Sequence, residues 1–496
     1  MDEVTLPAVE DGLDAAVADF ADRFRAALAP PAQAGVTLDV ETLRARFDEP
    51  LPGRGLPVER VLADLEERCT GGLAGGTGGR YFGYVTGGVL PATAIVEAWT
   101  AAVDQNTGMW PLGPAAVELE QVTLRWLAEL LGYPDGSGYF TTGATMANTI
   151  ALAVARHWFG ARHRVDVAEA GIRALPPFAV YGSEELHLSD YKALRTLGFG
   201  AGCVRRIPID ASYRMEVGPL VDAIDLDRRK GVEPAIVIAQ AGSVNTGASD
   251  PLDEIADVAS EHGLWFHVDG AFGAFFRLCP RTAPLVAGLE LADSLAVDAH
   301  KWLNVPNGTG FVLFRDAELH RAAFAGTAAY LTPGTGANLH ELGIEASRSW
   351  RGACVWAALK QLGRDGVAEL VTRCVDLTQE LARLVDDSPR LELTAPAPSC
   401  VCCFRYRPEG WDDGPRLDEL NRRIQAAVAC EGDIFHTGAQ LASGYCQRAA
   451  IVSWRTTSAD VEALARVVEA AGDRLARGST SVADTTARGR TATARS

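Results

Sequence analysis

The sequence of 496 residues lacks the features that mark membrane-bound, secreted and nucleic-acid-binding proteins. No apolar run reaches the length of a membrane-spanning helix. The acidic start, MDEVTLPAVEDGLDAAVADF, has no basic segment followed by an apolar core, so we expect no signal peptide. The formal net charge of −18 disfavours nucleic acid or an anionic membrane as the main partner. A local pocket can still bind an anionic small molecule.

Cysteines in paired spacings are also missing. The ten cysteines are scattered, apart from Cys400, Cys402 and Cys403, and no pair has the spacing of zinc ligands. We therefore expect free thiols, a cytoplasmic location and no bound metal.

The chain is too long for one ordinary core and changes character along its length. A helical pattern at 10–30 and a glycine-rich connector at 69–79 predict an N-terminal helical arm. Few large apolar residues near the end predict a disordered tail. The predicted units are the arm (1–90), a large domain (91–357), a small C-terminal α/β domain (358–478) and the tail (479–496).

Short apolar runs alternate with helical patterns through the large domain, which predicts an α/β fold with a mainly parallel sheet between helices. The runs are FAVYGS (178–183), AIVIAQAG (235–242), LWFHVDG (264–270), SLAVDA (294–299) and GFVLFR (310–315).

One candidate binding feature is a turn of small residues between a strand and a helix, in YFTTGATMANTIALAVAR (139–156). Gly143, Ala144 and Thr145 leave backbone N–H groups free, and the helix behind them adds a positive dipole. This pattern suits a phosphate. Taken alone, it also fits an ordinary threonine cap with a tight turn.

Three chemically useful side chains follow predicted strands: His187, Asp269 and Lys301. The carboxyl ends of parallel strands share one sheet edge, so these residues can meet there. Pyridoxal phosphate needs a lysine amine, an anionic partner for its pyridine nitrogen and a dipole for its phosphate. The apolar residues around Lys301 would favour a neutral, reactive amine. Alone, His187 would more often be structural.

In these motifs, and in RYFGYV (80–85) and ADSLAVDAHKWL (292–303), the sequence resembles the group II pyridoxal-phosphate-dependent amino-acid decarboxylases from about residue 80 to about 475. This family includes aromatic-amino-acid, tyrosine and glutamate decarboxylases. The resemblance implies a fold-type I transferase fold with a seven-stranded sheet, pyridoxal phosphate as cofactor, and a homodimer with sites at the subunit interface.

The resemblance also implies residue roles. Lys301 matches the lysine that binds the cofactor, and Asp269 matches the partner of the pyridine nitrogen. The other matches are His187 stacked on the ring, Ala271 under its other face, Gly143, Ala144 and Thr145 at the phosphate, His300 lining the site, and Asp298, where some members have an asparagine that helps hold the phosphate.

Tyr330, 29 residues after Lys301, matches a tyrosine that family decarboxylases carry on a mobile loop over the partner's site. There it is thought to protonate the substrate carbon after CO2 leaves, whereas aldehyde-forming relatives have phenylalanine. The match implies a decarboxylase. An aldehyde synthase or another lyase on the same fold remains the alternative, and a catalytically inactive scaffold is disfavoured because the whole set of residues is kept.

The residues expected around the substrate indicate two different substrate classes. The resemblance places Arg448 at its substrate end and QNTGMWPLG (105–113) along its wall. We predict an aromatic or hydrophobic L-amino acid, converted to its amine. Gly108, where aromatic-specific members often have a bulky residue, and a possible role of His436 at a distal carboxylate support an acidic substrate as the alternative. Val244 replaces a family threonine that could bond near the cofactor's phenolic oxygen. The pocket residues expected are Phe82, Asn106, Gly108, Trp110, His300 and Arg448.

Overall fold

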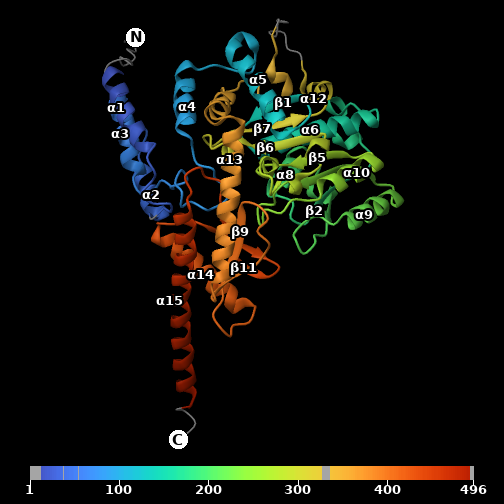
Figure 1. Cartoon of the computed structure of the whole chain (residues 1–496). Helices are drawn as coiled ribbons and strands as arrows, with labels where there is room; N and C mark the ends of the chain where they lie inside the picture. Colours follow the sequence, from blue (N-terminus) through green and yellow to red (C-terminus); the bar gives the residue numbers. More distant parts are fainter. Residues whose placement is uncertain (1–12, 37, 54, 327–335, 492–496) are drawn as a thin grey trace.

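The computed structural model describes residues 13–36, 38–53, 55–326 and 336–491, with side chains described up to residue 477. A large α/β domain carries a small C-terminal domain below it and a helical arm beside it (Figure 1). The predicted α/β architecture is confirmed.

The large domain is built on a seven-stranded sheet in the order β1-β7-β6-β5-β4-β2-β3. β7 runs antiparallel to both neighbours, and all other pairs are parallel. The five apolar runs became β2, β4, β5, β6 and β7, and the edge strand β3 was not predicted. The bounds are β1 (Ser137–Thr141), β2 (Phe178–Ser183), β3 (Val204–Ile207), β4 (Glu233–Gln240), β5 (Trp265–Asp269), β6 (Ser294–Asp298) and β7 (Gly310–Phe314).

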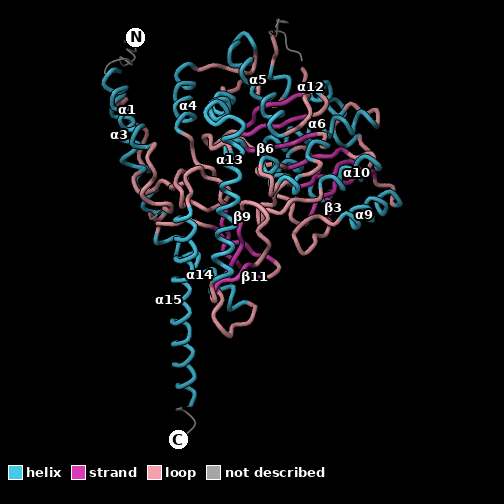
Figure 2. The backbone as a smooth tube through the Cα atoms, viewed as in Figure 1, coloured by secondary structure: helices cyan, strands magenta, loops and turns pink. Residues whose placement is uncertain are grey.

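Helices cover both faces of this sheet (Figure 2), which explains why its strands are almost continuously apolar. Along β4, Val237 and Ala239 pack into one hydrophobic cluster with α5, α9, α10 and α13, while Ile236 and Ile238 pack into another with α6 and α8. The longer helices are α4 (Pro91–Val103), α5 (Pro114–Leu131), α6 (Ala144–Arg162), α8 (Leu188–Thr196), α9 (Val217–Arg229), α10 (Leu252–His262), α12 (Ala317–Phe324) and α13 (Gly352–Asp387).

The register of the sheet gathers the strand ends that matter at one edge. Asp269 at the end of β5 pairs with Gln240 of β4 and Ala296 of β6. Because β7 is antiparallel, its first residue, Gly310, pairs with Asp298 on one side and with Thr141 of β1 on the other. The turns after β1, β2, β5 and β6 therefore converge.

The small domain has a four-stranded antiparallel sheet in the order β10-β11-β9-β8, covered by helices. The predicted boundary at 357/358 falls inside α13, which links the two domains and has one non-helical residue, Gly363. The bounds are β8 (Leu391–Leu393), β9 (Val401–Tyr406), β10 (Thr437–Leu441), β11 (Gly444–Ala450), α14 (Pro415–Glu431) and α15 (Ser458–Thr491).

At the end of the chain, α15 extends to Thr491. The disorder expected for 479–496 stays a prediction.

The N-terminal arm consists of α1 (Leu13–Ala27), α2 (Val40–Phe47) and α3 (Val58–Cys69), with α1 packed on α3. It lies beside α4 at the left of Figure 1. Neither α1 nor α2 has a buried residue, and Phe20, Phe47 and Val61 are between 42% and 54% exposed. Within this chain the arm therefore leaves much of its apolar surface uncovered.

A buried ion pair fastens the segment before α13 to α5. Arg348 and Glu120 are fully buried and meet at 3.0 Å. Arg348 also donates to the carbonyls of Thr107 and Phe140, and Glu120 accepts the backbone N–H of Gly352. Both terminal nitrogens of Arg348 and both oxygens of Glu120 thus have partners, while Nε of Arg348 has none among the described residues.

We expect Arg348→Met to lower the free energy of unfolding by about 3–5 kcal/mol, because Glu120 would remain buried without its partner. The exposed pair Arg364–Glu129 offers a matched control, and Arg364→Met should cost at most about 1 kcal/mol. Denaturant unfolding of the three proteins measures both values. Equal losses in the two variants would contradict this account.

Candidate active site

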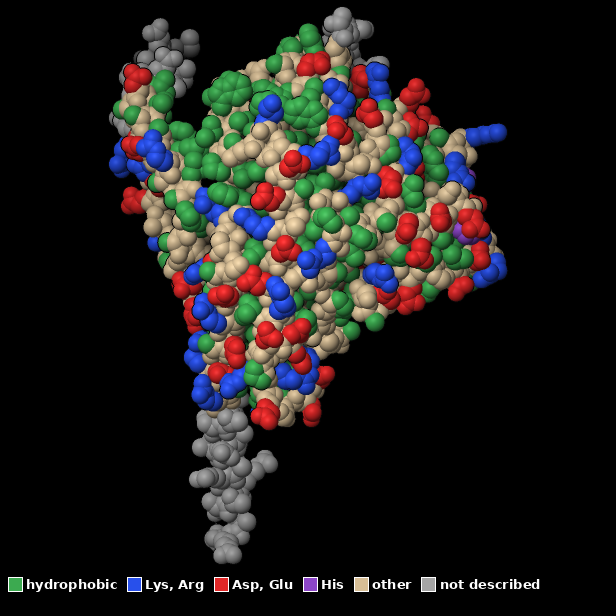
Figure 3. Space-filling model, viewed as in Figure 1, with side chains coloured by type: hydrophobic (Ala, Val, Ile, Leu, Met, Phe, Trp, Pro, Cys, Tyr) green, Lys and Arg blue, Asp and Glu red, His purple; other side chains and the backbone are tan. Residues whose placement is uncertain are grey.

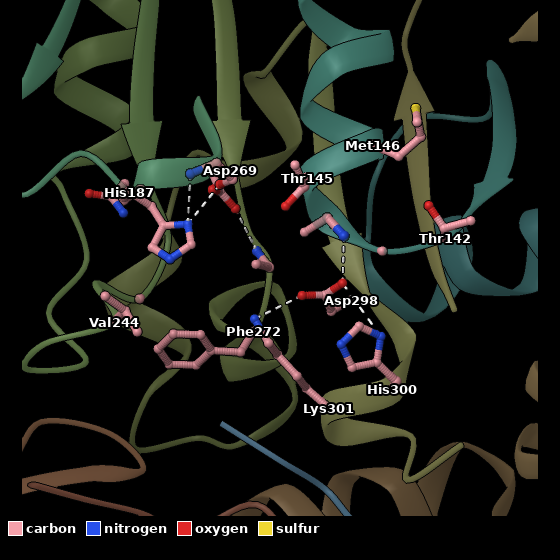
Figure 4. A pocket seen from close by; sticks show the side chains of 16 residues that line it. Thr142, Thr145, Met146, His187, Val244, Asp269, Phe272, Asp298, His300 and Lys301 are labelled. Carbon is pink, nitrogen blue, oxygen red and sulfur yellow. Dashed lines mark hydrogen bonds and ion pairs between the residues drawn. The ribbon is translucent and has the colours of Figure 1, made fainter. Parts of the chain in front are cut away.

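A cavity of about 230 Å3 lies at the sheet edge where the turns converge. Figure 4 shows His187 and Val244 on one side, Asp298, His300 and Lys301 on the other, and Asp269 between them. The cavity also contains the predicted Gly143, Ala144, Thr145 and Ala271. The structure therefore brings together the catalytic and cofactor-binding residues predicted from the sequence, apart from Tyr330, which lies outside the described residues.

Lys301 sits in the short helix α11 (Ala299–Trp302) directly after β6. Its neighbours Ala299 and Trp302 are fully buried and hold the turn, and the indole of Trp302 donates to the carbonyl of Phe272. Asn304 then donates to the carbonyls of Lys301 and Val452, which ties the turn to the small domain. This packing directs the lysine amine into the cavity.

The surroundings of Lys301 are less apolar than the sequence suggested. Its amine is 2.8 Å from Oδ2 of Asp298, and its side chain is 17% exposed, toward the cavity. The residues that are apolar in sequence, Ala299 and Trp302, hold the backbone of the turn. The amine of Lys301 itself contacts the carboxylate of Asp298.

Asp298 lies between Lys301 and the start of α6. Its Oδ1 accepts the N–H of Ala144 at 2.5 Å and lies 3.6 Å from Nδ1 of His300. Burial alone would raise the pKa of Asp298, but Lys301, His300 and the N–H of Ala144 together lower it below its ordinary value. Asp298 is therefore an anion at the same helix terminus that was predicted to hold a phosphate.

His300 also has a fixed orientation. Its Nδ1 lies 2.8 Å from the carbonyl of Thr309, so Nδ1 carries the proton and Nε2 is left as an acceptor or a second donor site. The ring lines the cavity beside Gly143, whose φ of 142° is one that residues with a side chain rarely adopt. Gly143 thus lets the chain turn from β1 into α6 next to His300.

Asp269 is surrounded by donors. Oδ1 accepts the N–H of Ala271 at 3.0 Å, and Oδ2 accepts the side-chain amide of Asn148 at 2.9 Å. The residue is 4% exposed and borders the cavity. The buried carboxylate is thereby kept charged at a place where a cationic ring nitrogen could reach it.

A chain of hydrogen bonds continues behind Asn148 that the sequence did not reveal. Its Oδ1 meets Nε2 of His267 at 3.1 Å, and Nδ1 of His267 meets the hydroxyl of Ser294 at 2.9 Å. Since Asn148 must offer its oxygen here, His267 carries its proton on Nε2. Burial lowers the pKa of His267 to about 4, so the ring is neutral. His267 could have been found from its spacing, because residues two apart share a strand face.

The same network fixes His187. The side-chain amide of Asn148 reaches Ser189 Oγ at 3.3 Å, and that hydroxyl lies 2.7 Å from Nδ1 of His187. The N–H of Ser189 also points at Nδ1, so Nδ1 is the acceptor and Nε2 carries the proton. Burial lowers the pKa of His187, which favours the neutral ring.

Of the substrate residues predicted from the sequence, His300 lines this cavity, and the other five do not. Phe82 is fully buried in the core, and Asn106 accepts N–H groups of Gly108 and Arg348. Trp110 donates to Glu118. A side chain at Gly108 would meet the carbonyl of Ala346, so glycine is required there for packing and says little about the substrate.

Arg448 is buried, and its guanidinium group donates hydrogen bonds to backbone carbonyls. Nε donates to the carbonyl of Val244 at 2.6 Å, and Nη1 donates to that of Tyr84 at 2.8 Å, while Nη2 has no partner among the described residues. His436 is fully enclosed, and burial lowers its pKa to about 4. His436 is enclosed and does not line the cavity, so the described contacts do not support a role at a distal carboxylate.

The side chains of Ser243 and Val244 point in different directions. Ser243 points away and donates to Glu185 at 3.0 Å, whereas Val244 lines the cavity. The hydrogen bond that a threonine could provide at Val244 is therefore replaced by an apolar contact.

The donor set fits pyridoxal phosphate. A carboxylate oxygen has two lone pairs, so Asp269 keeps acceptor capacity toward the cavity after binding Ala271 and Asn148. Lys301 supplies an amine in the same cavity, and the start of α6 supplies a positive dipole that an anion already uses. The fold and the cavity together define a pyridoxal-phosphate enzyme of the α/β type.

Comparison with known proteins identifies the family. Residues 41–407 match the model of the "Pyridoxal-dependent decarboxylase conserved domain", so the chain belongs to the pyridoxal-phosphate-dependent decarboxylases and is a carboxy-lyase. It is similar to an aromatic-L-amino-acid decarboxylase of Bacillus atrophaeus (28% identity; 88% of this chain, 90% of that one) and to tyrosine decarboxylase 2 of Arabidopsis thaliana (29%; 82% and 76%). The solved structure of mouse CSAD in apo form covers 94% of this chain and 99% of its own at a TM-score of 0.86 and 26% identity.

We expect Asp298→Asn to bind pyridoxal phosphate about tenfold more tightly than the wild type, because it removes a negative charge from the phosphate end. Calorimetric titration of the cofactor-free full chain measures the dissociation constant. Pyridoxal without phosphate is the matched control, and its affinity should change much less. An equal change for both ligands would contradict a phosphate position beside Asp298.

Proposed function

We propose that this enzyme decarboxylates an aromatic or hydrophobic L-amino acid to its amine and CO2. The observation that supports this substrate class is the charge of the cavity. Among its described lining residues, Lys301 is the one lysine or arginine, and it is paired with Asp298. Met146, Val244 and Phe272 supply apolar surface. An acidic substrate would need a further cation, and the relatives named above include aromatic-amino-acid decarboxylases.

We assign the following roles to the residues of the site. The role of Tyr330, which lies outside the described residues, rests on the resemblance to the family. When bound, pyridoxal phosphate supplies the electron sink that accepts the electron pair left as CO2 departs. Lys301 holds the cofactor and gives way to the substrate amine. Asp269 keeps a proton on the pyridine nitrogen, and His187 packs against one ring face opposite Ala271. Tyr330 donates a proton to Cα after CO2 has left.

We further propose that the active form is a homodimer. Large apolar side chains of α4, η1 (Trp110–Leu112) and the 344 region are exposed: Ile95 and Trp99 at 55%, Leu112 at 47% and Ile344 at 54%. Figure 3 shows hydrophobic side chains gathered over α4, facing the arm. A partner's arm and body could cover this surface, and residues 105–113 could then reach the partner's pocket. No described helix is long and apolar enough to cross a membrane. The ten free cysteines support a cytoplasmic location.

We expect Lys301→Ala to abolish the visible absorbance of the lysine-bound cofactor and to lower kcat by on the order of 10³-fold or more, because the amine has no substitute in the cavity. Absorbance spectra and CO2 release from a panel of amino acids measure both effects. Lys230→Ala, at an exposed turn, is the control and should match the wild type. Retention of the absorbance and of amine formation would refute the assignment.

We expect Tyr330→Phe to lower amine formation by about 10²–10⁴-fold, since it removes a proton donor. Any remaining turnover should yield aldehyde and H2O2, so CO2, amine, aldehyde and H2O2 are measured in one incubation. Co-expression with Lys301→Ala adds a test of the dimer: if Tyr330 acts on the partner's site, randomly mixed dimers should recover about a quarter of wild-type activity. No recovery would place Tyr330 in its own subunit's site.

A further inference from the structure

A second buried carboxyl group lies behind Asp269. Asp190 is in the first turn of α8, three residues after His187, and is fully buried. Neither of its carboxyl oxygens has a hydrogen-bond donor among the described residues. A buried carboxylate without donors is costly, so an ionised Asp190 is disfavoured at this position. The start of α8 offers only the small compensation of a helix dipole.

The carboxyl group beside Asp190 is that of Asp269, because the side-chain amide of Asn148 contacts both Asp269 and Ser189, the residue before Asp190. Two carboxyls can bond to each other only when one carries a proton. Asp269 has two donors of its own, Ala271 and Asn148, and is thereby stabilised as the anion. Asp190 has none, so the proton belongs to Asp190. Burial and the charge of Asp269 both raise the pKa of Asp190 well above its ordinary value.

The other titratable groups nearby do not supply a counter-charge. On α8, His187 is turned toward Ser189, and Lys192 is exposed. On β5, His267 is neutral and bonded to Asn148 and Ser294. From α6 the facing side chain is the uncharged Asn148.

Across the cavity, Lys301 and Asp298 pair with each other. Asp269 is therefore the group that sets the state of Asp190.

We propose that Asp190 is a positioning residue: a carboxylic acid that remains neutral and donates its O–H to Asp269. Asp269 then has three donors for its four lone pairs, from Ala271, Asn148 and Asp190, and one lone pair is left for a donor in the cavity. The two carboxyls share one proton and one negative charge, which matches one protonated pyridine nitrogen.

The protonation of Asp190 does not depend on the proposed pairing of Asp269 with the pyridine nitrogen. The effect of Asp190 on cofactor binding does rest on that pairing. The protonation of Asp190 can be tested without turnover. Infrared spectra of the full chain, with and without pyridoxal phosphate, should show the carbonyl stretch of a protonated carboxylic acid at about pH 8. The band should vanish in Asp190→Asn.

Asp250→Asn is the matched control. Asp250 is also buried, but the N–H groups of Met215 and Gln240 bind its two oxygens, so it should be ionised at that pH. Burial raises its pKa to about 6. The band should therefore persist in Asp250→Asn. Absence of the band from the wild type, or its persistence in Asp190→Asn, would overturn the proposal even if neither variant altered folding.

Stability and affinity add two further readouts. A pKa raised by folding gives stability that is present at low pH and is lost as pH rises through the folded value. The wild type should therefore lose thermal stability relative to Asp190→Asn as the pH rises above about 4, the ordinary pKa of an aspartate. Asp190→Leu, which cannot donate, should bind pyridoxal phosphate about tenfold more weakly, whereas Asp190→Asn keeps a donor and should bind nearly as well as the wild type. Parallel pH curves, or equal affinity losses in both variants, would contradict the proposed hydrogen bond.

Discussion

A buried carboxylate at the carboxyl end of a central strand must be supplied with hydrogen-bond donors, and the residues of the site are arranged to supply them. Asp269 obtains them from its own turn through Ala271 and from α6 through Asn148. Asn148 can donate there because its oxygen is engaged by His267, and its second contact with Ser189 fixes the orientation of His187. One amide thereby links the residue for the pyridine nitrogen with the residue that faces the ring, so neither can be altered without affecting the other.

The opposite side of the cavity depends on a second carboxylate. Asp298 bridges the N–H of Ala144 at the start of α6 and the amine of Lys301. This carboxylate thereby contacts both positive groups that the cofactor would engage. Gly87 lets the chain pass directly over the carbonyl of Lys301, where a side chain would collide.

Much of this arrangement can be predicted from the sequence, because strands buried on both faces are continuous apolar runs and the functional residues follow them. The edge strand Val204–Ile207 is not predicted from the sequence, because two of its four residues are arginines and it lacks a continuous apolar run. Asn148 and Asp190 are not recognised for another reason: their roles depend on contacts between α6, β5 and α8, which spacing does not reveal. An acidic residue in a first helical turn normally indicates a solvated helix end, so the burial of Asp190 could not be foreseen. Gly108 was interpreted as a specificity signal although backbone packing dictates it.

Asn304 has a consequence for the order in which the protein is made. Its side chain binds the carbonyls of Lys301, Trp302 and Val452, and its oxygen accepts the N–H of Trp454. It holds a left-handed backbone conformation with φ of 47° while doing so. The lysine turn therefore lacks part of its support until the residues around Val452 have been synthesised and the small domain has closed on the large one. A chain still emerging from the ribosome would have its lysine but not the framework that aims it, so capture of the cofactor belongs to the completed polypeptide.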